Sequence, residues 1–149
     1  MKPKILSWNV RGLNDGGKCL RVMRLLRQWK ADIVCLQNTE LEFTSSGIVN
    51  NMWGCPYVEW CYVASSGIGI LLMWDKRVVT KLEVCVGAFV AASTFRNVED
   101  DFIWTFARVY GHNLDNDRSL IWEEFADLFS LWALSWCIGG DFNVTHFPS

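Results

Sequence analysis

The feature that most limits what this chain can fold into lies near its end, at Trp136–Val144. A short apolar run, typical of a buried strand, stops there at Gly139 and Gly140, and Asp141 and Asn143 follow two positions apart. On an extended backbone such side chains share a face, so a carboxylate and a carboxamide would lie side by side. The acid could accept a proton or coordinate a hard cation. A plain turn is the alternative, because Gly, Asp and Asn all favour turns.

Three further motifs precede this stretch, and each joins an apolar segment to polar residues. They are Ser-Trp-Asn-Val-Arg-Gly at 7–12, Cys-Leu-Gln at 35–37 and Arg-Val-Tyr-Gly-His-Asn at 108–113. With Gly-Gly-Asp-Phe-Asn at 139–143, this ordered series closely resembles the exonuclease–endonuclease–phosphatase family. In detail it is similar to the apurinic-type endonuclease domain of plant LINE-type (non-LTR) retrotransposons. The resemblance extends from Lys4 to Asn143.

Hydrophobic periodicity predicts an α+β chain of mixed sheets. Strands are expected at 4–10, 32–37, 57–63, 67–74, 78–87, 89–95, 101–110 and 136–142, and helices at 18–29 and 116–132. The strand at 32–37 is apolar throughout, which predicts a central position, and the strands from 57 to 110 predict an antiparallel meander. Residues 41–53 predict a short helix broken at Ser45, Ser46 and Gly47. The predicted buried faces are Cys19, Val22, Met23, Leu26 and Trp29 in the first helix, and Ile121, Phe125, Leu128, Phe129 and Trp132 in the second.

The resemblance implies the architecture, a four-layer α/β/β/α sandwich of two mixed or antiparallel sheets with helices outside. This chain would form its N-terminal part. A length of 149 residues favours one domain, 1–149, which would be incomplete because the C-terminal portion of the family domain is absent. Nine Trp and nine Phe then predict core residues without partners, and an exposed apolar surface available for self-association.

The resemblance also implies hydrolysis of phosphodiester bonds, with a role for each matching residue. Asp141 looks like the aspartate that activates the attacking water, and Asn143 like the amide that holds Asp141 and the substrate in place. Tyr110 resembles the tyrosine that reaches the phosphate, although without the family it could be an ordinary strand-end aromatic. Asn113 resembles an asparagine that contacts the nucleic-acid backbone. Arg11 belongs to the basic first part of the chain and is assigned to phosphate binding.

The expected cofactor is Mg²⁺, with Mn²⁺ as an alternative, and the metal ligands depart from the family pattern. Asn9 resembles the strand-end asparagine that lies at the metal. The family has Leu-Gln-Glu-Thr where this chain has Leu-Gln-Asn-Thr at 36–39, so Asn38 replaces a carboxylate ligand. An amide keeps a ligating oxygen but lacks the charge that a hard cation prefers. Glu40 would be displaced by about 6.6 Å along a continued strand, too far for a metal bond unless the backbone bulges.

The family's later motifs, including a terminal Ser-Asp-His, have no counterpart before Ser149. The sequence therefore predicts a metal-dependent DNA endonuclease of retroelement origin that is a truncated, inactive remnant, and it leaves enzymatic activity open. The alternatives are a non-catalytic interaction module, an active nuclease completed by the missing half, and a phosphomonoesterase of the same family.

Charge and cysteine usage narrow the expected partners and location. Residues 1–30 hold eight Lys or Arg and one acid, within a net charge of −2. This beginning is compatible with a phosphate-facing edge, or with a solvated helix face. The six cysteines lack zinc-ligand spacing. No apolar run approaches transmembrane length, so no membrane partner is expected. The resemblance implies DNA as the partner. An intracellular location is expected, and the resemblance implies the nucleus.

Overall fold

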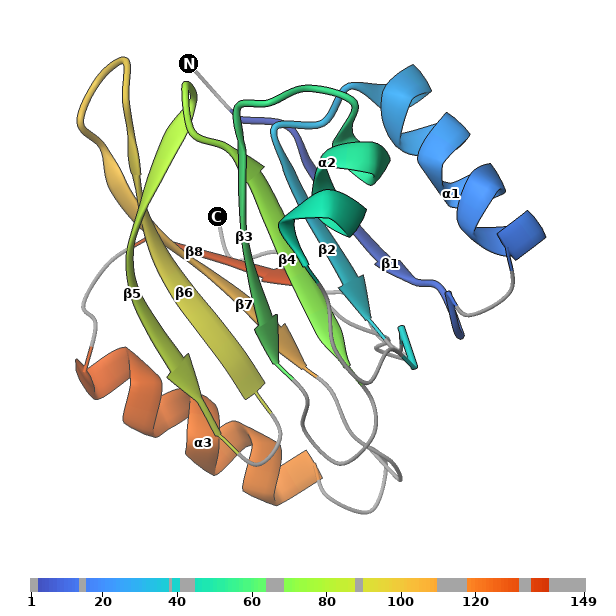
Figure 1. Ribbon diagram of the computed structural model, residues 1–149. Helices are drawn as coiled ribbons and strands as arrows, with labels where there is room; N and C mark the ends of the chain where they lie inside the picture. The colour runs from blue at the N-terminus through green and yellow to red at the C-terminus, as the bar shows by residue number, and fades with distance from the viewer. Residues whose placement is uncertain are drawn as a thin grey trace. The chain divides into compact units, whose positions relative to one another are not determined.

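The computed structural model of the chain (Figure 1) describes residues 3–13, 16–37, 39–40, 45–63, 69–87, 90–109, 118–131 and 135–139. In chain order its elements are β1 (Ile5–Asn9), α1 (Gly16–Trp29), β2 (Ile33–Gln37), α2 (Ser46–Trp53), β3 (Val58–Val63), β4 (Ile70–Asp75), β5 (Val79–Val86), β6 (Val90–Asn97), β7 (Ile103–Val109), α3 (Arg118–Leu131) and β8 (Ser135–Gly139). The predicted strands and the two predicted long helices are therefore confirmed, with differences at their ends.

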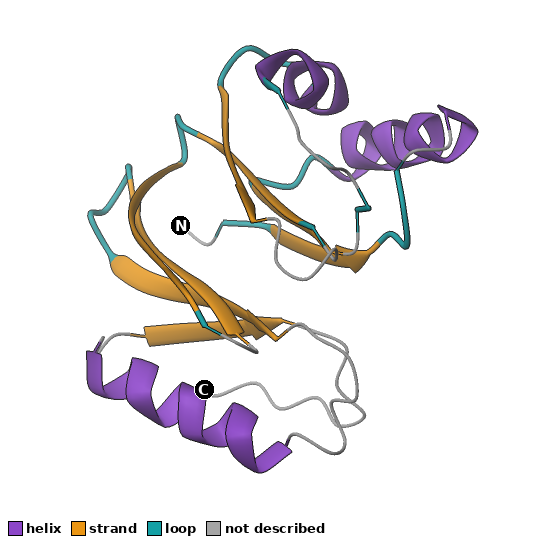
Figure 2. Cartoon of the chain, turned by 60° about the horizontal axis from the view of Figure 1, so that its bottom comes forward, coloured by secondary structure: helices purple, strands orange, loops and turns teal. Residues whose placement is uncertain are grey.

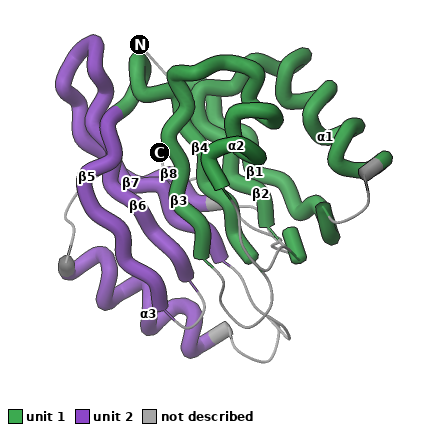
Figure 3. Tube along the Cα trace, viewed as in Figure 1, with its two compact units in different colours: residues 1–79 green, residues 80–149 purple. Residues whose placement is uncertain are grey.

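The chain divides into two compact units, residues 1–79 and 80–149 (Figure 3). One sheet has the strand order β1-β2-β4-β3, and the other has the order β5-β6-β7-β8. Both are mixed, because the β1/β2 and β7/β8 pairs are parallel whereas β2/β4, β3/β4 and β6/β7 are antiparallel. The α+β class with two mixed sheets is thus confirmed. The single-domain assignment stays a prediction.

The first unit is built on a β1–α1–β2 crossover. Parallel strands cannot be joined by a tight turn, so α1 carries the chain back to the start of β2. The resulting register runs from Ile5 opposite Ile33 to Asn9 opposite Gln37. β2 lies between β1 and β4, which confirms its central position. Its residues from Ile33 to Leu36 are at most 1% exposed.

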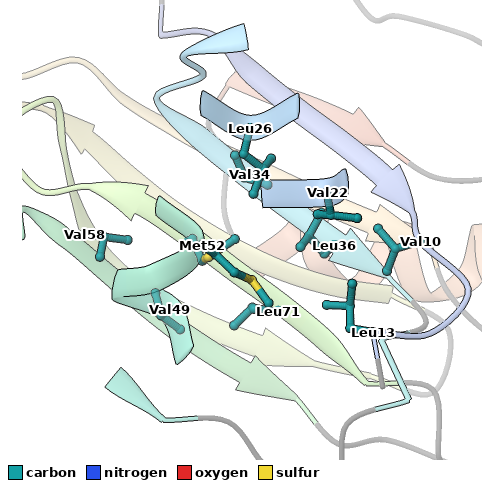
Figure 4. Close-up of a cluster of buried hydrophobic side chains, with 11 residues drawn as sticks. Val10, Leu13, Val22, Leu26, Val34, Leu36, Val49, Met52, Val58 and Leu71 are labelled. Carbon is teal, nitrogen blue, oxygen red and sulfur yellow. The ribbon is translucent and has the colours of Figure 1, made fainter. Parts of the chain in front are cut away.

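Two helices cover the same face of the first sheet (Figure 2). Figure 4 shows the core between these helices and the sheet. It comprises Val10, Leu13, Val22, Leu26, Val34, Leu36, Val49, Met52, Val58, Leu71 and Met73. Val22 and Leu26 confirm the buried face predicted for α1. The prediction was wrong for Trp29, which is 47% exposed at the helix end, with its ring centroid 6.0 Å from that of Trp8.

Ser45 begins α2 rather than breaking it. Its backbone is extended and its hydroxyl accepts a hydrogen bond from the Ile48 N–H, which is the geometry of a helix N-cap. Gly54, with φ 77°, ends the helix and donates its N–H to the Asn50 carbonyl oxygen. Ser46 and Gly47 are helical, so the predicted break was wrong at these two positions, because the hydroxyl of Ser45 satisfies an orphan N–H at the start of the helix. Residues 41–44 lie outside the described residues.

The predicted meander is split between the two sheets. β4 pairs with both β3 and β2, whereas β5 is a neighbour of β6 in the other sheet. Short connections correctly indicated the antiparallel β3/β4 and β6/β7 pairs. They did not indicate that the strand order changes sheet between β4 and β5, because local turn signals carry no information about long-range pairing.

In the second unit α3 packs on one face of the sheet (Figures 1 and 2). The buried cluster there is Val90, Ala92, Ala107, Val109, Ile121, Phe125 and Leu128. Three of the predicted α3 core residues are thus confirmed, but Phe129 is 43% exposed and Trp132 lies outside the described residues. Within the described part of the chain, no helix combines the length and the hydropathy needed to cross a membrane.

A charged pair closes the turn after β4. Arg77 donates from Nη2 to Oδ2 of Asp75 at 2.8 Å and from Nε to Oδ1 at 3.1 Å. Its guanidinium also lies over the Tyr57 ring, 4.2 Å from the ring centroid. The hydrogen bond from the Arg77 side chain holds the pKa of the Asp75 carboxyl below its usual value, against the opposite effect of burial.

Truncation of Leu71 tests the first core. Leu71 is 0% exposed, so Leu71→Ala should lower the free energy of unfolding by about 2–5 kcal/mol, from lost burial plus the cavity left behind. Leu20→Ala on α1 is the matched control, because Leu20 is 46% exposed. Urea denaturation monitored by tryptophan fluorescence measures both, and equal losses in the two variants would contradict the assigned core.

The Asp75–Arg77 pair predicts a pH dependence. Because the folded pKa of Asp75 lies below the unfolded value of about 3.9, the pair stabilises the fold above that pH, and the contribution is lost as the pH falls through the folded pKa. Asp75→Asn should therefore cost about 1 kcal/mol at neutral pH and progressively less in acid. Denaturant titrations across this range measure it, with exposed Asp127→Asn as control. A cost independent of pH would count against this assignment.

Candidate functional site

The carboxyl ends of β1 and β2 bring together the first group of polar side chains. The parallel register places Asn9 opposite Gln37, and the Val10 N–H extends the ladder to the Gln37 carbonyl oxygen at 3.0 Å. Oδ1 of Asn9 is shielded from solvent, and Gln37 is only 6% exposed. The predicted position of Asn9 at a strand tip is therefore as the sequence indicated, and Asn38 follows Gln37 directly in the chain.

The chain turns sharply after β1. Arg11 and Gly12 both have left-handed backbones, with φ 54° and 102°. The Arg11 side chain is exposed, and its carbonyl oxygen accepts a hydrogen bond from Lys18 Nζ at 2.6 Å. The Lys18 ammonium thus lies against the backbone of Arg11, beside the tip of β1. This local concentration of positive charge suits a phosphate group.

Glu40 does not continue strand β2. β2 ends at Gln37, and Glu40 has a left-handed φ of 57°. Two hydrogen bonds hold the segment, from the Leu13 N–H to the Thr39 carbonyl at 2.8 Å and from the Thr39 N–H to the Gly69 carbonyl at 3.1 Å. The Glu40 carboxylate lies against Gly12, where an added Cβ would be 2.9 Å from Oε2.

The second unit has a comparable edge at the ends of β7 and β8. These strands are parallel, with Arg108 opposite Gly139. Two segments that carry predicted catalytic residues follow these strand ends in the sequence. The predicted residues Asn38, Tyr110, Asn113, Asp141 and Asn143 lie outside the described residues.

Arg108 is a buried cation that the sequence analysis assigned no role. It is 3% exposed in β7, one position before the strand ends at Val109. Burying a guanidinium is costly unless it is hydrogen-bonded or paired, so a charged side chain within an apolar strand is a signal of a specific environment. The sequence offered that signal in the run Phe106–Val109. Periodicity alone did not show whether the arginine in this run is buried or exposed to solvent.

The donor atoms described at the β1–β2 edge do not by themselves fit a tightly bound metal ion. Over the described ranges there is no group of three or more His, Cys, Asp or Glu side chains that could hold one. Asn9 and Gln37 offer neutral amide oxygens, whereas a hard cation such as Mg²⁺ prefers one or two carboxylates. Asn38, which the sequence analysis adds to this set, lies outside the described residues.

Comparison with known proteins identifies this architecture. Residues 6–149 match the family described as Endonuclease/Exonuclease/phosphatase family. This match confirms the family named from the sequence motifs. The comparison with curated proteins gave no match.

Solved structures show the same fold at low sequence identity. The human Nocturnin catalytic domain, with bound sulfate, has a TM-score of 0.68 at 14% identity, covering 95% of this chain and 65% of that one. A mannosyl-6-phosphatase of Bacteroides thetaiotaomicron has a TM-score of 0.69 at 16% identity, covering 97% and 67%. TDP2 of D. rerio, complexed with a single-strand DNA product, has 0.66 at 17%, covering 97% and 62%. The chain spans about two thirds of the length of these structures.

Gly12 provides a test of the turn that carries Arg11. Gly12→Ala should destabilise the chain by about 1–3 kcal/mol, because φ is 102° and the new methyl group meets the Glu40 carboxylate. The matched control is Gly47→Ala, since a Cβ at Gly47 has only Ser45 Oγ nearby, at 3.8 Å. Thermal unfolding measures both. Combining Gly12→Ala with Glu40→Ala should recover only the steric part of the loss, and full recovery would rule out backbone strain.

Proposed function

Because the chain belongs to the Endonuclease/Exonuclease/phosphatase family, we propose that it derives from a metal-dependent phosphodiester hydrolase acting on DNA and retains little or none of that activity. The observation that carries the proposal is the parallel β1/β2 pair, which ends with Asn9 beside Gln37 and leads directly into Asn38. The proposal includes descent from a plant LINE-type retroelement endonuclease. The proposed descent rests on the motif series at 7–12, 35–37, 108–113 and 139–143.

The catalytic roles in this proposal follow from the chemistry of each side chain. Asp141 is the general base that takes a proton from the attacking water. Asn143 orients Asp141 through an amide hydrogen bond. Tyr110 donates to a phosphate oxygen as negative charge develops there. Asn113 and Arg11 hold the nucleic-acid backbone, and exposed Arg11 has Lys18 beside it to add positive charge.

The divalent cation, Mg²⁺ or Mn²⁺, is the weakest part of this machinery. Its proposed ligands Asn9 and Asn38 are both neutral, and the carboxylate of Glu40 lies against Gly12. A hard cation loses most of its binding energy without a charged ligand. We therefore propose that this chain binds the ion weakly and has little or no hydrolytic activity, as expected of a remnant.

DNA is favoured as the substrate over a phosphomonoester. The first thirty residues carry eight Lys or Arg, and exposed Arg21 and Arg24 continue the basic character along α1. A polyanion gains more than a single phosphate from such an extended charge. The fold similarity to a mannosyl-6-phosphatase supports the phosphomonoesterase as the second candidate. A nuclear location belongs to the DNA proposal.

Restoring the missing carboxylate tests the proposed site. Asn38→Glu should raise Mg²⁺-dependent nicking of supercoiled plasmid at least about tenfold over the unmodified chain, because a charged ligand strengthens ion binding. Adding Asp141→Ala should remove the gain, since the general base contributes about 10²–10⁴ in rate. Asn38→Gln is the matched control, because it has the length of Glu without the charge. An increase in the Gln variant equal to that of Glu would discard the charge argument.

Metal binding is measured separately from catalysis in the same variants. Terbium luminescence sensitised by the chain's nine tryptophans reports ion affinity without any substrate. The Asn38→Glu variant should bind the ion at least about tenfold more tightly than Asn38→Gln. Tighter binding without nicking would place the defect in the catalytic residues. Hydrolysis of p-nitrophenyl phosphate in preference to plasmid would favour the phosphomonoesterase.

A further inference from the structure

The edge strand β5 presents apolar side chains to solvent. Among the described strands β5 is terminal in its sheet, with β6 as its neighbour. Leu82, Val84 and Val86 are 41%, 40% and 44% exposed. Because they alternate along the strand, they lie on the same face. Cys85 points to the opposite face, where it packs against the cluster under α3. An exposed apolar edge of this kind is a template for pairing with another strand.

The hydrogen bonds of β5 show which of its backbone groups point outward. The Gly87 N–H donates to the Val90 carbonyl at 2.8 Å, and the Glu83 N–H donates to Thr94 Oγ1 at 3.0 Å. The Glu83 carbonyl accepts from Ser93 Oγ at 3.1 Å. Odd-numbered residues of β5 therefore direct their backbone groups toward β6. By alternation, the residues that direct N–H and C=O to the outer edge are Thr80, Leu82, Val84 and Val86.

We propose that β5 pairs antiparallel with β5 of a second copy of this chain, about a two-fold axis at Leu82. In this register Leu82 lies opposite Leu82 of the second copy, and Thr80 lies opposite Val84. These residues point outward in both copies, so they form the hydrogen-bonded pairs of the new ladder. Isologous pairing of this type is closed, so it stops at a dimer.

Charge complementarity selects this register. The two-fold axis at Leu82 places Lys81 opposite Glu83 of the second copy, and Glu83 opposite Lys81, in non-hydrogen-bonded pairs whose Cα atoms are about 4.5 Å apart. An axis at Glu83 would instead oppose two glutamates, and an axis at Val84 would oppose Glu83 and Cys85. A lysine on an edge strand normally discourages pairing. Here Glu83 of the second copy offsets it, which favours a second copy over an unrelated strand.

This inference goes beyond hydrolysis, and it gives a location to the self-association that the aromatic content predicted. A proline at position 84 tests it. The Val84 N–H points to the outer edge, so Val84→Pro removes a bond of the dimer without removing one between β5 and β6. Sedimentation velocity should show a dimer for the unmodified chain and for Val84→Thr, and a monomer for Val84→Pro with unchanged far-ultraviolet circular dichroism. A Val84→Pro dimer would overturn the proposal.

Charge exchange tests the register, and it remains informative if the proline variant does not fold. Lys81→Glu and Glu83→Lys should each weaken dimerisation by about tenfold or more, because each places like charges opposite one another twice. The double exchange restores both pairs and should restore the dimer. A double variant as monomeric as the single ones would overturn the proposal. So would a monomeric unmodified chain at its highest soluble concentration.

Discussion

The first unit depends on the burial of β2 between two strands. Residues Ile33–Leu36 are almost completely removed from solvent, so their backbone groups must be satisfied by neighbouring strands. β1 supplies one ladder in parallel and β4 supplies the other in antiparallel orientation. The parallel ladder requires the α1 crossover, and α1 in turn covers one face of the sheet with Val22 and Leu26. The juxtaposition of Asn9 and Gln37 is a direct consequence of that register.

Stability and chemistry are therefore carried by different residues. Apolar residues of β1, β2, β4 and the helices hold the first core, whereas the polar residues assigned to the site lie at the ends of β1 and β2. Compared with the Glu of the family motif, an Asn at position 38 removes one negative charge from the proposed site. Because fold and site are under separate physical constraints, a protein can lose a carboxylate that binds metal and still keep its fold. The same separation leaves the β5 edge open to a role unrelated to hydrolysis.

Local sequence patterns predicted the centre of each buried helix face better than its margins. The i, i+3, i+4 spacing correctly identified Val22 and Leu26 as buried, because a helix that packs on a sheet hides one stripe. It failed for Trp29 and Phe129, which lie at the margins of their stripes, where exposure depends on what neighbours the helix. The start of α2 was misassigned for a related reason. A serine favours both a turn and a helix N-cap, and only the position of the Ile48 N–H distinguishes them.

Strand identity, chain order, the two long helices and the family were all readable from the residues, because periodicity and motif spacing are local properties. The placement of Asn9 at a strand end followed from the same information. Pairing was decided by the tertiary structure: β4 joins β2 while β5 joins β6, and Glu40 folds back onto Gly12. A pattern of apolar residues states which face of a strand is buried, but it does not state which distant segment covers that face. That choice depends on the packing of the whole unit.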